Sequence, residues 1–317
     1  MKAIVQDRYG SAANLRIEEV DRPVPDATSV LLKVRSASVN ALDWRILSGS
    51  PLVGRFLFGL RRPKRRIRGV DVSGEVVEVR KPDSRFKVGD AVFGLGSGTF
   101  AEFVAADESE LTAKPDSLSF DDAATLGVAA FTAFQALRSN GPIRDGQLVA
   151  ILGSASGVGS FAVQIAKAWG ARVTAVTSTE NVELIRSLGA DVVVDYRKAN
   201  FTSTPGRFDL VLDVSGIYSL GALLHVVNRT GLLVVVGTRG GFGRFIQSGI
   251  RRRILRQRVR AMVAHCKVED LAELGNLVVQ GKIKPAIDRV YSLSDAPKAL
   301  AQAELHRARG KLVIHVD

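Results

Sequence analysis

Cysteine is almost absent from this sequence, which has 317 residues and a single cysteine, Cys266. One thiol excludes a disulfide-stabilised scaffold and a structural zinc site built from several thiolates. Long apolar runs are also absent. No stretch approaches the ~20 apolar residues that span a bilayer, and the opening segment MKAIVQDRYG lacks the apolar core of a signal peptide. We therefore expect a cytoplasmic protein in a reducing compartment, held at most peripherally at a membrane surface.

Acidic residues are outnumbered, with 32 Asp and Glu against 44 Lys and Arg, which gives a net charge of +12. The excess lies in two segments that lack acidic residues: residues 60–68 (LRRPKRRIR) hold six basic residues and residues 244–260 (RFIQSGIRRRILRQRVR) hold seven. Apolar residues precede both segments. We expect a basic surface with apolar edges, which suits an amphipathic substrate with an acidic head or an anionic membrane.

Two other interpretations of the basic segments remain open. Charge runs are often solvated faces without a partner. Basic patches also attract the phosphates of nucleic acids. However, few aromatic residues lie beside these charges to stack on bases, so nucleic acid is the weaker interpretation.

The residues that are present indicate a globular protein of two domains. Hydrophobic residues make up 46% and charged residues 24% of the chain, as in soluble globular proteins, and the length is about twice the ~150 residues of an ordinary domain. The first part carries short β-branched runs, namely SVLLKVRSASV, GEVVEV, DAVFGL and TFAEFVA. From residue 148 onward, apolar strands (148–152, 172–176, 192–196, 208–214 and 232–237) alternate with helical segments such as 159–170 and 180–189. This alternation predicts a parallel sheet covered on both faces.

A glycine-rich turn follows the first of these strands. Residues 148–152 run into GSASGVGSFA, in which Gly157, Gly159 and Ala162 match the pattern G-x-G-x-x-G/A. A pyrophosphate can approach the backbone only where no Cβ intervenes, and the next helix offers unpaired N–H groups and a positive dipole end. We therefore predict a dinucleotide-binding turn rather than an unrelated βα turn. The candidate phosphate-binding residues are Gly153, Ser156, Gly157, Val158 and Gly159.

The end of the second strand predicts the choice of cofactor. An acidic residue there binds the 2′-hydroxyl of NAD, whereas a basic residue binds the 2′-phosphate of NADP. Glu180 could therefore serve NAD, or be only a solvated carboxylate in the first turn of a helix. Arg197 and Lys198 leave the third strand on the same side of the sheet and could pair with a phosphate. The candidate residues at this end of the cofactor are Ser178, Glu180, Asn181 and Tyr196.

Motifs along essentially the whole chain resemble the zinc-free quinone oxidoreductase branch of the medium-chain dehydrogenases/reductases, and most of all the chloroplast-envelope quinone oxidoreductase homologues and their bacterial relatives. They include SVNALDW (38–44), GVDVSGEVVEV (69–79), FKVGDAVFG (86–94), GTFAEFV (98–104), FTAFQAL (131–137), NVELIRSLGAD (181–191) and the final GKLVIHV. The resemblance implies an α/β protein with two domains and an active site in the cleft between them. A GroES-like β-rich catalytic domain would span residues 1–122, completed by 288–317, and a Rossmann domain would span residues 123–287.

The resemblance also implies a site without zinc. The first zinc-ligand cysteine of the zinc-dependent branch would fall near Asn40, and the Gly-His-Glu motif of that branch is replaced by Gly69-Val70-Asp71. No histidine pairs with another ligand at metal spacing; the four are His225, His265, His306 and His315.

Roles for individual residues follow from the same resemblance. The family motif Val-Asn-x-x-Asp matches Val39, Asn40 and Asp43, so Asn40 is expected beside the nicotinamide and Asp43 is expected to orient its loop. A turn asparagine that bonds its own backbone is the alternative for Asn40. Thr132 is expected to face the nicotinamide, and Val236, Gly237 and Thr238 to hold its carboxamide. Trp44, Phe56 and Phe242 are expected to line the substrate pocket.

The implied activity is hydride transfer from NAD(P)H to a quinone or an α,β-unsaturated carbonyl. Asn40 or the ribose 2′-hydroxyl would donate to the carbonyl oxygen; Tyr9 is a weaker donor candidate, and water would supply the proton. NADPH is expected, with NADH as a serious alternative because NADP-preferring relatives often have Lys or Arg in place of Glu180.

The sequence leaves the oligomeric state open, although a homodimer is common among relatives. The alternative function is a cofactor-binding homologue whose main role is to bind a membrane or nucleic acid through its basic segments.

Overall fold

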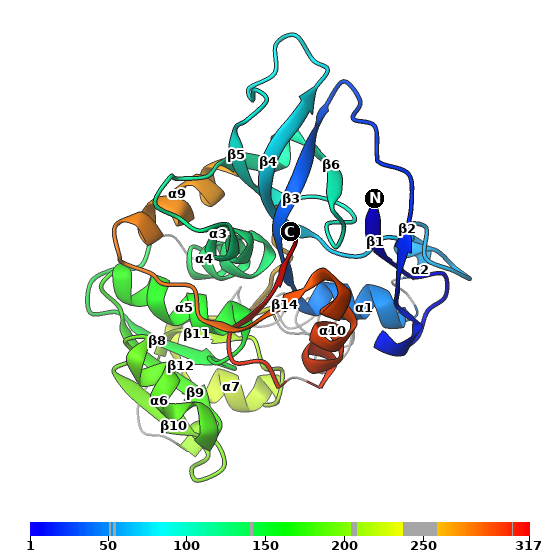
Figure 1. Cartoon of the computed structure of the whole chain (residues 1–317). Coiled ribbons are helices and arrows are strands. Elements are labelled where there is room, and N and C mark those ends of the chain that lie inside the picture. Colours follow the sequence, from blue (N-terminus) through cyan, green and yellow to red (C-terminus); the bar gives the residue numbers. More distant parts are fainter. Residues whose placement is uncertain (51, 53–54, 140–141, 204–207, 237–258, 306) are drawn as a thin grey trace. The chain divides into compact units, whose positions relative to one another are not determined.

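The chain forms two compact units in a computed structural model that describes all residues except 51, 53–54, 140–141, 204–207, 237–258 and 306 (Figure 1). Unit 1 comprises Met1–Phe131, Cys266–Gly281 and Ile287–Asp317, and unit 2 comprises Thr132–His265 and Lys282–Ala286. These limits differ from the domain limits expected at residues 122 and 288. In particular, the helix at 268–279 groups with unit 1 rather than with the second domain.

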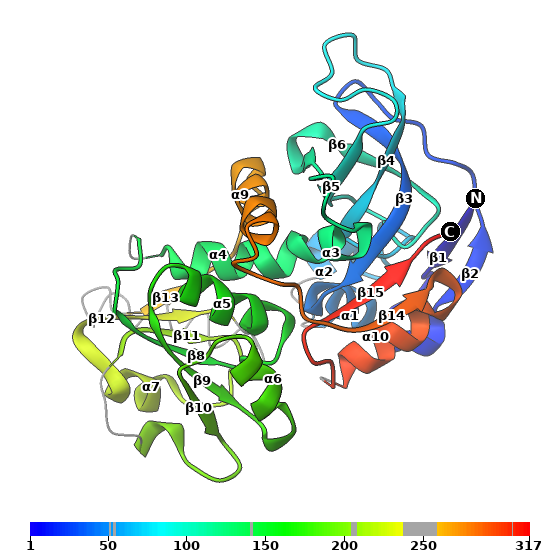
Figure 2. The same cartoon turned by 60° about the vertical axis from the view of Figure 1, so that its left-hand side comes forward.

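Unit 1 is built around a seven-stranded sheet in the order β14-β15-β3-β4-β5-β7, with β6 also paired to β3. The strands are β3 (Ser29–Val39), β4 (Asp71–Val79), β5 (Ala91–Leu95), β6 (Phe103–Asp107), β7 (Leu111–Ala113), β14 (Ile287–Ser292) and β15 (Lys311–His315). All pairings are antiparallel except that of β14 with β15. Figure 2 shows β15, in red, beside β3, in blue. A separate hairpin joins β1 (Lys2–Val5) to β2 (Arg16–Glu19).

Short helices surround this sheet. They are α1 (Ala41–Ser48), α2 (Arg55–Phe58), α3 (Phe120–Thr125), α9 (Val268–Val279) and α10 (Ala296–Glu304). The helix α10 buries Ala296, Ala299 and Leu300, which lie on one helical face and belong to the same apolar core as the strands β3 and β15. The helix α1 is followed by Gly49, whose φ of 65° is the left-handed conformation that glycine adopts at helix ends.

Unit 2 contains a six-stranded sheet in the order β10-β9-β8-β11-β12-β13. Its strands are β8 (Leu148–Leu152), β9 (Arg172–Thr177), β10 (Val192–Asp195), β11 (Phe208–Asp213), β12 (Val227–Val235) and β13 (Val259–Ala261), and all are parallel. Relative to chain order this is the arrangement 3-2-1-4-5-6 of a doubly wound dinucleotide-binding sheet. The predicted Rossmann fold class is therefore confirmed.

Of the α-helices of unit 2, the first precedes β8 and begins at the last residue of the first segment of unit 1, and the others connect parallel strands. These helices are α4 (Phe131–Leu137), α5 (Gly157–Ala168), α6 (Val182–Ser187) and α7 (Leu220–Val226). The helix α7 packs through Leu223 and Val226 against alternate sheet residues such as Ala150 and Val211. Strand residues alternate between the two faces of the sheet, so the remaining apolar positions lie on the opposite face. This explains why the sequence of each strand is a continuous apolar run. None of the described helices has the length and hydropathy needed to cross a bilayer.

Candidate functional site

A phosphate cradle lies where β8 leads into α5 in unit 2. Gly153 follows the strand with a φ of 77°, which a side chain would strain. Ser156 caps the helix: its Oγ accepts a hydrogen bond from the Gly159 N–H at 3.1 Å and donates to the Gly153 carbonyl at 2.8 Å. Gly157 and Val158 occupy the first turn, in which N–H groups have no intrahelical acceptor. The turn therefore presents free donors at a positive helix end, as a pyrophosphate requires.

Gly159 allows the helix to approach this turn closely. A Cβ at Gly159 would lie 2.2 Å from the Gly153 carbonyl oxygen and 2.6 Å from the Ser154 Cα, both of which are backbone atoms. No side chain fits there without moving the strand or the helix. Gly159 therefore lets the helix pack closely against the turn that would hold a pyrophosphate, and the residues present fit a dinucleotide.

The residues after β9 form a network of charges. Glu180 is ion-paired with Arg197, with 3.0 Å between Oε1 and Nη2. Thr179 donates a hydrogen bond to Asp195 at 2.7 Å, and Lys198 lies 4.0 Å from the same carboxylate. Hydrogen bonding by the Glu180 backbone, together with the Arg197 charge, holds the pKa of Glu180 below its usual value. The negative charges of Glu180 and Asp195 are therefore balanced by two basic side chains, at the point where the sequence predicts the ribose of the cofactor.

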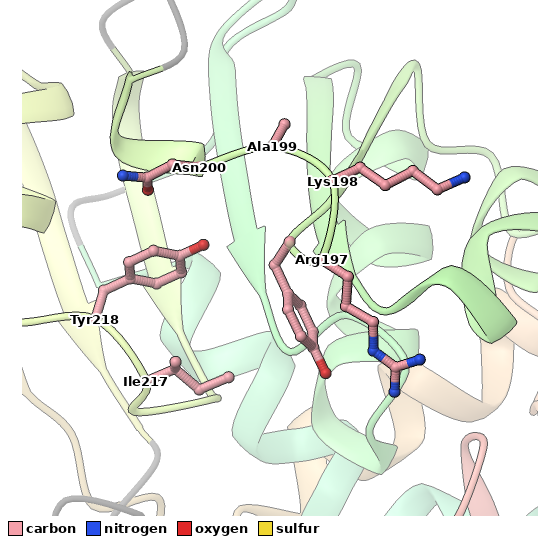
Figure 3. A pocket seen from close by; sticks show the side chains of 7 residues that line it. Arg197, Lys198, Ala199, Asn200, Ile217 and Tyr218 are labelled. Atoms are coloured by element: carbon pink, nitrogen blue, oxygen red, sulfur yellow. The ribbon is translucent and has the colours of Figure 1, made fainter.

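A cavity of about 360 Å³ lies beside this network. It is lined by Tyr196, Arg197, Lys198, Ala199, Asn200, Ile217 and Tyr218. Figure 3 shows Ile217 and Tyr218 on one side and Arg197 and Lys198 on the other. The loops that carry these residues follow β10 and β11, so the cavity lies at the carboxyl ends of parallel strands, where doubly wound sheets bind ligands.

The structure places the other cofactor candidates of unit 2 at strand and helix ends. Asn181 donates to the Ser178 hydroxyl at 2.9 Å. Thr132 is buried near the start of α4. Val236 follows β12 directly, and its N–H donates to the Asp213 carbonyl at 3.0 Å. Gly237, Thr238 and Phe242 lie outside the described residues.

In unit 1, Asn40 lies between the end of β3 and the start of α1 and is only 6% exposed. Its N–H donates to Asp43 Oδ2 at 2.8 Å, which ties the loop to the first turn of the helix. Burial raises the pKa of Asp43 to about 7. Asp43 is thus joined to the backbone of the Asn40 loop, and its role in orienting this loop for the reaction stays a prediction.

Lys311 also contacts Asn40, and sequence reasoning gave it no role. Its Nζ donates to Asn40 Oδ1 at 2.7 Å and to the Val39 carbonyl at 3.2 Å, and lies 3.3 Å from Asp71 Oδ2. Lys311 is 1% exposed and Asp71 is fully buried. One signal in the sequence could have found it. Lys311 directly precedes the apolar run LVI of a strand, and lysine is almost never buried without a partner.

The amide of Asn40 is left with a free donor. Its Oδ1 is taken by Lys311, and Nδ2 is buried without a hydrogen-bond partner among the described residues. A buried donor without an acceptor costs ~1–3 kcal/mol, so it points to an acceptor supplied by a ligand. This free donor is what the expected interaction with a carbonyl oxygen requires.

Asp71 is the counter-ion of Lys311. It accepts a hydrogen bond from the Ser38 hydroxyl at 2.6 Å and one from the Val128 N–H at 2.9 Å. A Cβ at Gly127 would lie 2.3 Å from Asp71 Oδ1, so glycine is required for the approach of this chain segment. The Gly69-Val70-Asp71 segment, expected to replace a zinc-ligand motif, supplies a carboxylate that pairs with Lys311.

Metal ligands do not gather in the described part of the chain: no group of three or more His, Cys, Asp or Glu side chains there could hold an ion. Cys266 is half-buried, and burial raises the pKa of its thiol to about 12.

The aromatic candidates of unit 1 have different environments. Trp44 packs against the apolar core. Phe56 is 71% exposed on α2. The Tyr9 hydroxyl donates to the Gly59 carbonyl at 2.6 Å, and the Arg55 guanidinium lies over its ring. Tyr9 is thus packed, and its proton is already engaged.

Comparison with known proteins identifies the family. Residues 26–116 match the alcohol dehydrogenase GroES-like domain, and residues 188–314 match a zinc-binding dehydrogenase domain. The chain is 33% identical to the mitochondrial NAD(P)H oxidoreductase RTN4IP1 of Bos taurus, over 100% of this chain and 89% of that protein. It is 35% identical to the 2-methylene-furan-3-one reductase of Solanum lycopersicum, over 99% and 79%.

A solved structure gives the same result. The quinone oxidoreductase of Coxiella burnetii superposes with a TM-score of 0.89 and 30% identity, and the match covers 100% of this chain and 99% of that one. The chain therefore belongs to the medium-chain dehydrogenase/reductase superfamily, as a member of its quinone oxidoreductase-like group of NAD(P)H-dependent oxidoreductases.

Proposed function

We propose that this protein reduces quinones or α,β-unsaturated carbonyl compounds with NADPH. The observation that carries the proposal is the buried Asn40 amide, whose Nδ2 lacks an acceptor among the described residues while Lys311 holds its oxygen. The glycine turn at Gly153 and Gly159 supports the cofactor, because its geometry suits a pyrophosphate.

The residues of this chain act by position and polarity. When bound, the reduced nicotinamide supplies a hydride. Reduction of an enone places negative charge on the carbonyl oxygen, and the Asn40 amide N–H is the donor that we propose for this oxygen. The Lys311 ammonium, 2.7 Å from Asn40 Oδ1, fixes the amide with its donor side free and polarises it further. Water supplies the proton.

NADPH is proposed over NADH because Glu180 is already neutralised. Its ion pair with Arg197 removes the free carboxylate that would repel a 2′-phosphate. Arg197 is more than half exposed, and the guanidinium N–H groups that do not contact Glu180 can donate to a phosphate. NADH remains the alternative, since the same carboxylate can accept a hydrogen bond from a 2′-hydroxyl.

Calorimetric titration with NADPH and NADH, followed by nicotinamide absorbance in the presence of a quinone and an enone, tests the proposal. We expect tighter binding of NADPH and loss of absorbance with at least one acceptor. Asn40→Ala should lower kcat roughly 10²-fold and leave the Kd of NADPH unchanged. Asn276→Ala, at an exposed position of α9, is the control. A protein that binds neither nucleotide would overturn the proposal.

The remaining assignments are part of the same proposal. We propose a cytoplasmic location because a single thiol suits a reducing compartment. Peripheral contact with an anionic membrane rests on the charge of residues 60–68 and 244–260. A homodimer stays a prediction.

A further inference from the structure

A second cavity, of about 320 Å³, lies within unit 1, and we call it the basic pocket. It is lined by Leu42, Asp43, Ile46, Phe58, Lys64, Arg65, Ile67, Arg68, Gly69, Val70, Gly96 and Ser97. Its volume is in the range of small-molecule sites. Its lining combines one apolar wall with three basic side chains.

The apolar wall comes from short elements that flank the pocket. Leu42 and Ile46 are one helical turn apart on α1, so they present one continuous face. Phe58 adds the end of α2, and Ile67 and Val70 lie in the chain leading to β4. Such a wall suits the hydrocarbon part of a ligand.

The three basic residues of the pocket have no ion-pair partner within 4.0 Å among the described residues: they are Lys64, Arg65 and Arg68. Their neighbour Arg66 differs, because it is paired with Asp7 at 2.7 Å and with Glu18 at 3.1 Å. The basic segment is therefore divided. Arg66 is neutralised at the surface, whereas the three basic residues that line the pocket have no ion pair among the described residues.

Arg68 is the strongest sign of a missing anion. It is only 5% exposed, its Nη2 donates to the Arg65 carbonyl, and its Nε has no hydrogen-bond partner among the described residues. Burial lowers the pKa of Arg68, which shows that its charge is poorly solvated. A buried guanidinium with an unpaired N–H is costly unless an anion pairs with it.

The basic pocket adjoins the proposed reaction site. Asp43 lines the pocket and also accepts the hydrogen bond from the Asn40 N–H at 2.8 Å. Because burial raises the pKa of Asp43 to about 7, this carboxyl carries less than a full negative charge near neutral pH, and it offsets only part of the three positive charges.

We propose that the basic pocket binds the anionic group of an amphipathic substrate, with Arg68 as the residue that pairs with a carboxylate. This rests on the proposed function, since it names the class of enone that the protein reduces: one with a carboxylate on an aliphatic body. The guanidinium forms a charge-assisted pair with the carboxylate, and the apolar wall covers the hydrocarbon.

Binding can be tested without turnover. Octanoate and octanamide share an aliphatic chain and differ in charge. We expect calorimetry to detect octanoate but not octanamide, and Arg68→Met, Lys64→Gln and Arg65→Gln each to weaken octanoate binding, roughly tenfold for Arg68→Met. Arg61→Gln removes the same charge from an exposed residue that does not line the pocket, and should leave binding unchanged. Equal binding of octanoate and octanamide, or equal weakening by Arg61→Gln, would overturn the proposal.

Turnover separates this inference from the proposed function. With NADPH, an enone whose carboxylate ends a saturated chain, such as 9-oxo-10-undecenoic acid, should have a KM roughly tenfold below that of its methyl ester, and Lys64→Gln should reduce the difference. Reduction of acid and ester with equal KM would reject the anion pocket alone, whereas reduction of no quinone or enone would reject the proposed function. If phosphatidylglycerol vesicles bind through Arg68 and octanoate does not bind, a lipid headgroup is the ligand and the substrate assignment is wrong.

Discussion

At the scale of single residues, Lys311 and Asp71 form a buried ion pair that also holds Asn40. Removal of one partner of such a pair leaves the other charge buried and uncompensated, which costs ~3–5 kcal/mol. We predict a loss of this size for Lys311→Met in urea unfolding, with partial recovery in Lys311→Met/Asp71→Asn. Lys298→Met is the matched control because its ion pair with Asp295 is exposed and such pairs contribute little. Equal losses in both lysine variants would contradict this account.

Asp43 links folding stability to pH. Its pKa is raised by burial from 3.8 to about 7, so the folded state holds this proton more tightly than the unfolded state does. The stability that the protonated Asp43 carboxyl contributes is therefore complete below pH ~4, falls as pH rises, and is lost above pH ~7. A difference of this size corresponds to at most about 4 kcal/mol.

Asp43→Asn tests this linkage, because an amide oxygen can still accept the bond from the Asn40 N–H. We predict that the free energy of unfolding of the variant falls less than that of the parent protein between pH 4.5 and 7.5. Parallel stability curves for the two proteins would show that Asp43 ionises normally.

Glu180 tests the choice of cofactor. Glu180→Gln removes the partner of Arg197 and frees this guanidinium for a 2′-phosphate. We predict that the ratio of the Kd for NADH to that for NADPH rises roughly tenfold. Glu183→Gln makes the same charge change nearby on α6, where Glu183 pairs with Arg186, and should leave the ratio unchanged.

At the scale of elements, the turn between β8 and α5 decides cofactor binding. In Gly159→Ala the new Cβ would meet the Gly153 carbonyl at 2.2 Å, so the helix must move away from the strand. We predict a loss of at least tenfold in nucleotide affinity, measured by calorimetry, together with a lower Tm. Gly275→Ala in α9 is the control: its Cβ would have ordinary contacts, and alanine favours a helix by about 1 kcal/mol.

The elements also show what could be predicted from the sequence. The strand Ser29–Val39 and the strands β8 to β12 of unit 2 were predicted because apolar and β-branched runs are local signals, whereas the short strand Val259–Ala261 was not predicted. The cradle at Gly153–Gly159 was predicted because its glycine pattern is also a local signal. The contact of Lys311 with Asn40 was missed because it joins residues 271 positions apart and depends on the pairing of β15 with β3. The place of the helix at 268–279 also depends on tertiary packing, in this case against β7 and the Leu126–Ala130 segment.

At the scale of the whole molecule, the net charge of +12 comes from two segments, of which the structure describes the first and only the end of the second. Arg61, Arg62, Lys64 and Arg65 are exposed in the first. We predict that the protein pellets with vesicles containing phosphatidylglycerol and not with pure phosphatidylcholine, and that binding falls as salt is raised. Equal pelleting with both lipids would refute an electrostatic contact.

The position of β15 within unit 1 bears on how the protein is made. A ribosome adds Lys311 long after β3, and β15 then inserts between β14 and β3. By that time the residues of unit 2, through Ala286, have already emerged. We expect the nucleotide unit to fold on the nascent chain while the edge of β3 that later pairs with β15 is still uncovered. Throughout this interval the nascent chain carries an open strand edge, which chaperones can cover until the final strand arrives.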